Sequence, residues 1–307
     1  MTARFILSLD CEGKWGVADH LGRNEQRSLT DDALRAAYSA ILGLLDEYEV
    51  PATFAFVGLF GESPAGFRTL RAEIDRLAGK APEYLAPALR DIDDGSREGW
   101  HGDWAVDAVG SSRLGHEIAL HGVTHLPWAK VGRELAAEEL ALFSSLTSAV
   151  GRSRTFIYPR NQVAHVDLLD RIGIEGYRLA PRSRSRAASL ASEFNLLTPP
   201  ESDPPSAPAG PLPIPAGYFV NWQKSLRRLV PQAVSNARFG AMLRRAQRGS
   251  RIVHLWLHPE NIATAPATLS LLRKLLRQVA RVRDAGQCKV LTQLDYVQRR
   301  RAAIAAG

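Results

Sequence analysis

The sequence has few cysteines, no long apolar run and no signature of a nucleic-acid-binding module. Its 307 residues include two cysteines, Cys11 and Cys288, which form no CxxC pair, so a disulfide framework or a cysteine-rich zinc site is not expected. Nowhere do about 18 uncharged apolar residues follow one another, and no basic leader with an apolar stretch precedes the acid at position 10. We expect a cytoplasmic protein in which histidine and carboxylate hold any metal.

Acidic residues are scarce in one part of the chain. Between Leu226 and Arg301 there are 16 Lys and Arg against 3 Asp and Glu, whereas the whole chain has 39 and 32. This basic stretch has no zinc-finger spacing, RRM signature or interleaved aromatics, so no nucleic-acid partner is expected. Two interpretations stay open: Arg-rich solvated helix faces, or peripheral association with an anionic membrane, which would place the protein at the inner face of the membrane.

Strand-like apolar runs alternate with amphipathic helical ones. The run "TDDALRAAYSAILGLLDEYEV" predicts a helix with Thr30 as its N-cap. Alternating βα order predicts an α/β fold, either a barrel or a strongly curled open sheet of about seven parallel strands. The predicted strands lie in residues 5–9, 51–58, 115–121, 155–159, 177–181, 251–258 and 289–292.

Two long segments interrupt this alternation. Residues 60–113 mix helical pieces with the loop "DIDDGSREGWHGDW", and residues 181–217 are rich in Arg, Ser and Pro. We expect the second segment to be irregular. With both taken as insertions, residues 1–307 are expected to form a single catalytic domain.

Polar residues follow several of the predicted strands. One strand ends at Asp10 and Glu12, another runs into His121, and a late strand runs into His258. Because the carboxyl ends of parallel strands build the active site in α/β folds, these side chains are expected to converge on one rim.

The motif "HGVTH" places His121 and His125 four residues apart, so that both imidazoles can face one ion from a helical turn. Alone this spacing is weak evidence for a metal. A neighbouring carboxylate strengthens it, because two histidines and one carboxylate form a common open metal site. A second carboxylate could then serve as general base.

Four segments, "SLDCEG", "GHEIALHGVTH", "FIYPRN" and "HLWLHPEN", together resemble the polysaccharide deacetylase family, carbohydrate esterase family 4. The resemblance spans roughly residues 4 to 296. It implies a distorted (β/α) barrel and a hydrolase that removes N- or O-linked acetyl groups from sugars with one divalent metal, with zinc expected ahead of cobalt, nickel or manganese.

The resemblance also implies roles for single residues. Glu12, His121 and His125 would be metal ligands, Asp10 the catalytic base, and His258 the acid that protonates the leaving group. The first motif here is Asp-x-Glu, as in a variant branch, where the family usually has Thr-Phe-Asp-Asp, so the roles of the two acids could be exchanged. Cys11 between them is expected to be a small buried residue, with a thiolate ligand as the alternative.

Other motifs depart from the family pattern. The Arg of Arg-x-Pro-x-Gly is replaced by Ile157, so Arg160 is the candidate to reach the Asp10 carboxylate or an anionic substrate group, with a surface arginine as the alternative. The Asp-x-x-Asp-Trp motif is not evident, and Arg178 on the next strand is the polar candidate nearby. His254 is expected to be a satisfied core histidine.

Substrate contacts are expected from Asn161, beside Arg160, and from the loop "GWHGDW". Aromatic faces and acids are typical of sugar clefts, so Trp100, His101 and Asp103 are candidates for a substrate wall; otherwise the two tryptophans anchor a loop. The expected partner is an acetylated sugar or a glycan intermediate of surface polysaccharide synthesis. Two alternatives are a metal-dependent hydrolase of non-sugar C–N bonds, of the cyclic ureide type, and a non-catalytic protein that binds anionic surfaces.

Overall fold

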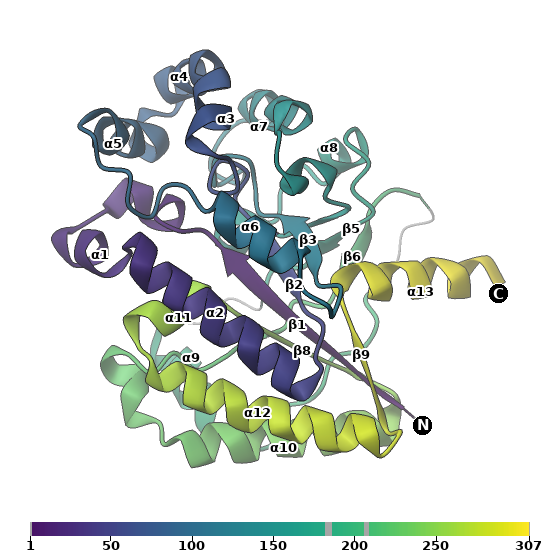
Figure 1. Ribbon diagram of the computed structural model, residues 1–307. Helices are drawn as coiled ribbons and strands as arrows, with labels where there is room; N and C mark the ends of the chain where they lie inside the picture. The colour runs from purple at the N-terminus through teal and green to yellow at the C-terminus, as the bar shows by residue number, and fades with distance from the viewer. Residues whose placement is uncertain (1, 182–185, 206–208, 307) are drawn as a thin grey trace.

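A curled parallel sheet forms the centre of the molecule, and helices cover its outside (Figure 1). The computed structural model describes residues 2–181, 186–205 and 209–306. In them the sheet has nine strands: β1 (Ala3–Cys11), β2 (Thr53–Phe56), β3 (Glu117–Leu120), β4 (Thr155–Phe156), β5 (Gly176–Arg178), β6 (Leu212–Ile214), β7 (Tyr218–Phe219), β8 (Ile252–Leu257) and β9 (Cys288–Leu291).

The strand order is β6-β5-β4-β3-β2-β1-β8-β7, and β9 pairs with the first residues of β1. All the pairings between named strands are parallel. The edge strands β6 and β7 are joined by residues 215–217 alone, a connection too short to separate the two edges widely. The sheet therefore curls into a distorted (β/α) barrel, which confirms the expected fold class.

The helices bury apolar faces against the sheet. In the longer ones, apolar residues recur at helical spacing, as in α2, where Thr30 accepts a hydrogen bond from the Ala33 N–H at 3.2 Å and forms the expected N-cap. The helices are α1 (Arg23–Ser28), α2 (Asp31–Tyr48), α3 (Pro64–Thr69), α4 (Arg71–Lys80), α5 (Pro82–Asp93), α6 (Asp103–Gly110), α7 (Arg133–Ala141), α8 (Asp167–Asp170), α9 (Arg186–Ala191), α10 (Gln232–Gly249), α11 (Pro259–Thr264), α12 (Ala267–Asp284) and α13 (Gln293–Ala306).

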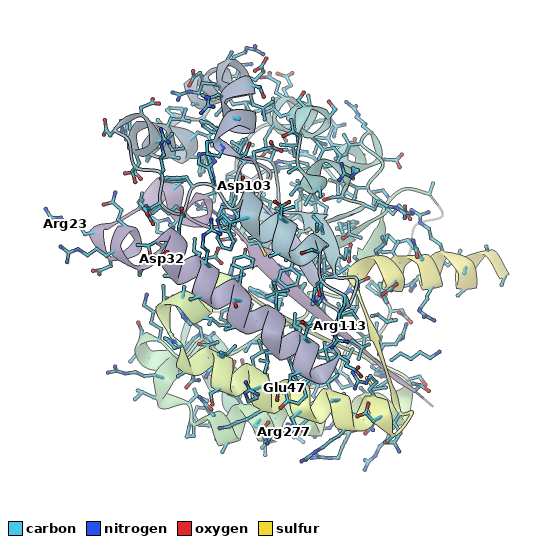
Figure 2. The ribbon with its side chains drawn as sticks, viewed as in Figure 1. Arg23, Asp32, Glu47, Asp103, Arg113 and Arg277 are labelled. Atoms are coloured by element: carbon cyan, nitrogen blue, oxygen red, sulfur yellow. The ribbon has the colours of Figure 1, made fainter. Side chains whose placement is uncertain are left out.

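Charged side chains cover the outer faces of these helices. Glu47 of α2 and Arg277 of α12 lie on the outside of the helical layer, and Arg23 of α1 projects into solvent (Figure 2). In the described part of the chain, no helix is long and apolar enough to cross a membrane.

The segment 181–217 differs from the expected irregular insertion. Its described residues include α9 and strand β6, and β7 follows directly after it. Both strands are only two or three residues long, and β6 carries Pro213, which an edge strand tolerates because it needs fewer N–H donors. The prolines around these two strands predict irregular structure, so about seven strands were expected where nine occur in the described residues.

Candidate active site

Strand register brings the expected polar residues to one rim of the barrel. Leu9 of β1 pairs with Leu257 of β8, so the next residues, Asp10 and His258, lie side by side. On the other side Phe56 of β2 pairs with both Cys11 and Leu120, which places His121 directly beyond the same level. Because side chains alternate along a strand, Asp10 and Glu12 share the inner face.

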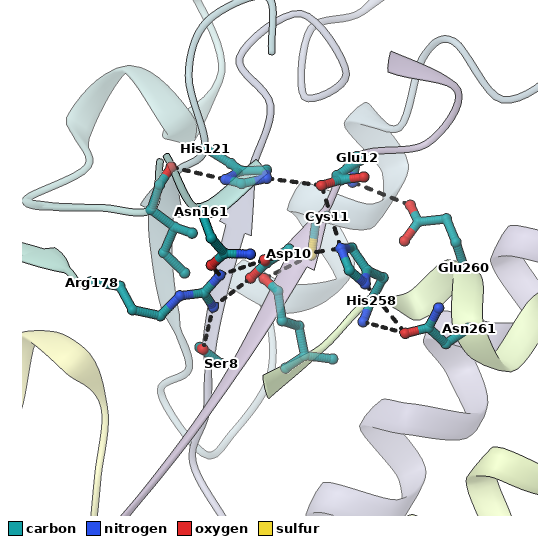
Figure 3. A network of polar contacts seen from close by, with 12 residues as sticks. Ser8, Asp10, Cys11, Glu12, His121, Asn161, Arg178, His258, Glu260 and Asn261 are labelled. Atoms are coloured by element: carbon teal, nitrogen blue, oxygen red, sulfur yellow. Dashed lines mark hydrogen bonds and ion pairs between the residues drawn. The ribbon is translucent and has the colours of Figure 1, made fainter. Parts of the chain in front are cut away.

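The Glu12 carboxylate lies close to three imidazoles, and Figure 3 shows two of them, those of His121 and His258. Its Oε1 atom is 2.9 Å from His121 Nε2, 3.2 Å from His125 Nε2 and 3.5 Å from His258 Nε2. Glu12, His121 and His125 form a group that could hold a metal ion. Asp10 and His258 can also group with Glu12, and the His258 Nε2 atom lies 4.0 Å from Asp10 Oδ2.

The hydrogen bonding of His121 fits a bound cation. Its Nδ1 lies 2.8 Å from the Ile157 carbonyl oxygen, so the ring proton is donated there and the Nε2 lone pair points at the Glu12 carboxylate. Two acceptors facing each other at this distance repel unless a cation or a proton lies between them. Burial lowers the pKa of His125 even beside Glu12, which favours the neutral ring that metals bind. The donor set of two imidazoles and one carboxylate therefore suits a divalent metal.

Asp10 is held by Arg178, the last residue of β5. Nη1 and Nη2 of Arg178 donate to the two carboxylate oxygens of Asp10 at 2.7 and 2.6 Å, and both side chains are almost fully buried. Nη2 also donates to Asn161 Oδ1 at 2.7 Å. Burial opposes ionisation of Asp10, but the Arg178 charge, with His121 and His258 nearby, holds the pKa of Asp10 below its usual value. The carboxylate is thus kept charged and fixed in orientation.

A buried chain of hydrogen bonds holds the Arg178 guanidinium in place. His254 Nδ1 lies 2.8 Å from the Pro215 carbonyl, which fixes the proton there, and its Nε2 accepts from the Ser8 hydroxyl at 2.9 Å. Ser8 in turn accepts from Arg178 Nη1 at 3.1 Å. Burial, with Arg178 close by, lowers the pKa of His254 to about 3, so the ring stays neutral. The expectation of a satisfied core histidine is confirmed.

His258 is positioned by the turn that begins α11. Asn261 Oδ1 accepts from the His258 backbone N–H at 3.0 Å and from its Nδ1–H at 3.3 Å. The Nε2 atom therefore faces Glu12 and Asp10. Burial disfavours the charged ring, but Glu12 and Asp10 outweigh it and raise the pKa of His258. Its side chain is 24 % exposed, against 1 % for Asp10, so it borders the open side of the site.

Two further acids, the half-buried Glu260 and the buried Glu139, hold the loops that carry these candidate ligands. Glu260 Oε1 accepts from the backbone N–H groups of Glu12 and Gly13, at 3.2 and 2.6 Å. Glu139 of α7 accepts from the Thr124 N–H and hydroxyl at 2.7 and 3.0 Å and from Trp128 Nε1 at 2.5 Å. Glu139 thereby ties down the loop between His121 and His125.

The expected contact between Arg160 and Asp10 is wrong. Arg160 has a left-handed backbone with φ of 57°, and its Nη2 pairs with Asp19 Oδ2 at 2.6 Å. Its guanidinium also lies 5.8 Å from the centre of the Tyr84 ring. The guanidinium beside Asp10 belongs to Arg178, one strand further along the sheet.

The expected substrate wall is wrong in part. Trp100 is fully buried, packs edge-on against Trp15 and donates to Asp91 at 2.7 Å, so it anchors the loop. His101 is buried against Phe67, with Nδ1 3.2 Å from the Glu62 carbonyl.

Asp103 is half-buried in the first turn of α6, and its substrate contact stays a prediction, as does that of Asn161. The aromatic rings beside His258 are Phe219 and Trp256, with centroids 6.1 and 5.8 Å away.

Cys11 faces away from the candidate metal ligands. It lies in the hydrophobic core, and burial, then the negative charge of Glu260, raises its pKa well above the usual value. The thiol stays protonated, so Cys11 is the small buried residue that was expected.

Sequence reasoning missed several residues of this network, namely Ser8, Glu139, Glu260 and Asn261, and gave Arg178 little weight. Two of these residues, Ser8 and Asn261, could have been found from their positions in the sequence. Ser8 shares the strand face of Asp10 and Glu12, and Asn261 stands at the third position after His258, where a side chain can cap the helix start.

No protein-family model matches the chain, and no curated protein matches it either. Among solved structures, a candidate polysaccharide deacetylase from Mycobacterium smegmatis superposes with a TM-score of 0.61 at 16 % identity, covering 98 % of this chain and 91 % of that one. The two proteins share a fold. At this sequence identity, the structural similarity is evidence for a shared fold alone.

Two weaker similarities are to domains of family 4 carbohydrate esterases. The Xyl-CE4 domain of a multidomain xylanase from the hindgut metagenome of Trinervitermes trinervoides has a TM-score of 0.45 at 13 % identity, covering 98 % of this chain and 92 % of that one. The family 4 carbohydrate esterase from Streptomyces lividans, in complex with acetate, has a TM-score of 0.44 at 9 % identity, covering 91 % and 88 %.

Proposed function

We propose that this protein is a metal-dependent hydrolase that removes an acetyl group from a sugar or a glycan intermediate. The observation that carries the proposal is the convergence of three imidazole Nε2 atoms on Glu12 Oε1, at 2.9 to 3.5 Å, beside a second carboxylate locked by Arg178. Such a cluster on a fold shared with a candidate polysaccharide deacetylase supports acyl transfer to water.

Glu12, His121 and His125 would hold the divalent metal, for which zinc suits the nitrogen and oxygen donors. When bound, such an ion supplies Lewis acidity toward a carbonyl oxygen and toward water.

Asp10 would accept the proton of the attacking water. Its lowered pKa keeps it ionised at neutral pH, and the two hydrogen bonds from Arg178 keep its oxygens in one orientation. His258 would donate its proton to the departing amine or hydroxyl. Asn261 orients the ring for this step, and the raised pKa of His258 keeps the proton available.

The substrate would approach from the side of His258, whose ring is partly exposed and flanked by Phe219 and Trp256. An aromatic ring beside the leaving group suits the C–H face of a sugar. We propose an acetylated intermediate of surface polysaccharide synthesis as the substrate class.

Metal content and acetate release, measured together, test this function. Chelated protein should release no acetate from acetylated chito-oligosaccharide or acetylated xylan, and zinc should restore the activity. Glu12→Gln should lower metal occupancy and acetate release together, because one of three protein ligands loses its charge. Full activity of the metal-free protein would overturn the metal-dependent reaction. Opening of a cyclic ureide without acetate release from any sugar would replace the acetyl substrate.

A further inference from the structure

Large apolar side chains are exposed in two short segments of the chain. Among the described residues, the exposed large hydrophobic side chains are Phe194, Leu196, Leu197, Leu226, Leu229 and Ile304. The first five belong to residues 194–197 and 226–229, and Ile304 lies apart on α13. We call these five side chains the apolar patch. Leu197, Leu226 and Leu229 are 66 to 75 % exposed. Contact of this apolar surface with water is unfavourable, and such exposed patches are typical of binding surfaces.

The two segments lie side by side in the fold. The first begins at the last residue of the short 3-10 helix η5 (Ser192–Phe194), and the second lies within the 3-10 helix η6 (Ser225–Leu229). Arg227 Nη1 of η6 lies 3.5 Å from Glu193 Oε1 of η5. Glu193 also accepts from Arg238 of α10 at 2.9 Å. The patch is therefore fixed on a folded base rather than on a loose tail.

Basic residues surround the patch. Within η6, Arg227 and Arg228 stand between the two exposed leucines, and Arg228 is itself exposed. Arg245 of α10 donates from Nη1 to the Leu196 carbonyl at 2.6 Å, so it lies beside the patch as well. The η6 part of the patch stands at the start of the stretch from 226 to 301, in which basic residues outnumber acidic ones 16 to 3. Its charge complements an anionic surface.

The patch also lies close to the candidate active site. The Arg227 guanidinium is 5.3 Å from the centre of the Phe219 ring, and the Phe219 ring is 6.1 Å from that of His258. Only one side chain separates Arg227 of η6 from His258. A surface bound at η6 would therefore stand beside the open side of the site.

We propose that the apolar patch and its arginines dock on an anionic membrane surface, where the leucines enter the interface and the arginines meet phosphate headgroups. Two leucines that flank two arginines within one short turn suit an interfacial layer, in which apolar side chains contact the acyl boundary and arginines contact headgroups at nearly the same depth. A protein partner would have to supply matching anions beside an apolar cavity. Docking itself does not depend on the proposed reaction.

Vesicle co-sedimentation of the full chain tests the docking. Wild type should bind acidic vesicles of phosphatidylglycerol and phosphatidylcholine at low salt, bind pure phosphatidylcholine much less, and dissociate as salt is raised. Arg228→Glu should weaken partitioning on the order of tenfold, since about 1 kcal/mol is contributed per basic residue near such a surface. Leu226→Ser with Leu229→Ser should weaken it at least as much. Arg227 is left unchanged because it joins the two segments.

The matched control makes the same kind of change on α13, which projects to the right in Figure 1, whereas α10 lies along the bottom of the molecule. Ile304→Ser with Arg299→Glu should bind acidic vesicles as wild type does. Thermal melts and acetate release from a soluble substrate should be unchanged in the patch variants, which shows that they fold. Equal recovery of wild type with neutral and acidic vesicles would overturn the proposal. So would equal weakening by the control, or self-association through the patch without vesicle binding.

Discussion

Two buried carboxylates at opposite ends of the sheet have opposite pKa shifts. Asp10 lies at the carboxyl end of β1 and Glu117 at the amino end of β3, and both are almost inaccessible to solvent. Asp10 meets the charged guanidinium of Arg178, and its pKa is lowered. The donors to Glu117 in the described part of the chain are neutral, namely the hydroxyls of Thr53 and Thr155 and the Leu294 N–H, and burial raises the pKa of Glu117.

The difference shows that burial alone does not make a carboxylate reactive. Both acids are desolvated, but only the one with a buried cation is held charged beside a partly open site. Glu117 instead joins β2, β3 and β4 to the start of α13. One end of the barrel is therefore suited to chemistry, and the other to holding the last helix in place.

The largest expected effect comes from removing the charge of Asp10. Asp10→Asn should lower turnover by a factor on the order of 10² or more, because the proton acceptor is lost. Metal content should stay at the wild-type level, since Glu12, His121 and His125 remain. Elemental analysis beside acetate release measures both. Metal loss in Asp10→Asn together with full metal in Glu12→Gln would show that the roles of the two acids are reversed.

A smaller effect is expected from the cation that holds Asp10. Arg178→Lys keeps a charge but loses the paired hydrogen bonds, and turnover should fall by about tenfold to 10². The pH at which activity is half lost on the acid side should rise, because the pKa of Asp10 is then less depressed. Arg160→Lys is the matched control and should change turnover little, since Arg160 contacts Asp19. Equal losses in both variants would mean that the pairing with Asp10 does not matter to the reaction.

The sequence was enough to predict the residues at the ends of long strands. Asp10 lies near the end of β1, and Glu12 and His258 directly follow β1 and β8, which have nine and six residues; parallel register alone brings such ends together. The choice between Arg160 and Arg178 could not be made in this way. It depends on the left-handed backbone at Arg160, which turns the side chain toward Asp19, and on the curl of the sheet, which brings β5 to face β1.

Burial of the residues in the inserted segments could not be predicted from the sequence either. Trp100 packs against Trp15, a residue 85 positions away whose Nε1 donates to the Trp100 carbonyl at 3.0 Å. Such a contact leaves no periodic pattern in either segment. Strands β6 and β7 are as short as β4 and β5, but they were missed because they lie in and directly after a segment rich in Arg, Ser and Pro, a composition that predicts irregular structure.

At the other end of the sheet, Glu117→Gln should lower stability and leave turnover unchanged. The amide keeps one acceptor oxygen for three donors, so unfolding should cost about 1 to 2 kcal/mol less. Because the folded pKa of Glu117 is raised, the wild-type acid stabilises most below about pH 4.5, its unfolded value, and loses that contribution as pH rises through the folded pKa. The stability gap to the glutamine variant should therefore narrow as pH rises. Denaturant unfolding at several pH values measures this difference in unfolding free energy. A difference that widens as pH rises would contradict a raised pKa of Glu117 in the folded protein.

The smallest expected effect concerns His116, at the same end of the barrel. Its Nδ1 accepts from the Ala52 N–H at 3.1 Å, and burial lowers its pKa to about 4 from 6.5. A neutral buried histidine contributes stability that is lost as pH falls from about 6.5 toward 4, since the unfolded chain binds the proton more readily. His116→Gln keeps an acceptor for the Ala52 N–H but does not titrate. The loss of unfolding free energy between pH 7 and pH 5 should therefore be about 1 kcal/mol smaller in the variant than in wild type. Identical pH profiles for the two proteins would show that protonation of His116 does not oppose folding, and Glu117 would then be the group to examine at this end of the sheet.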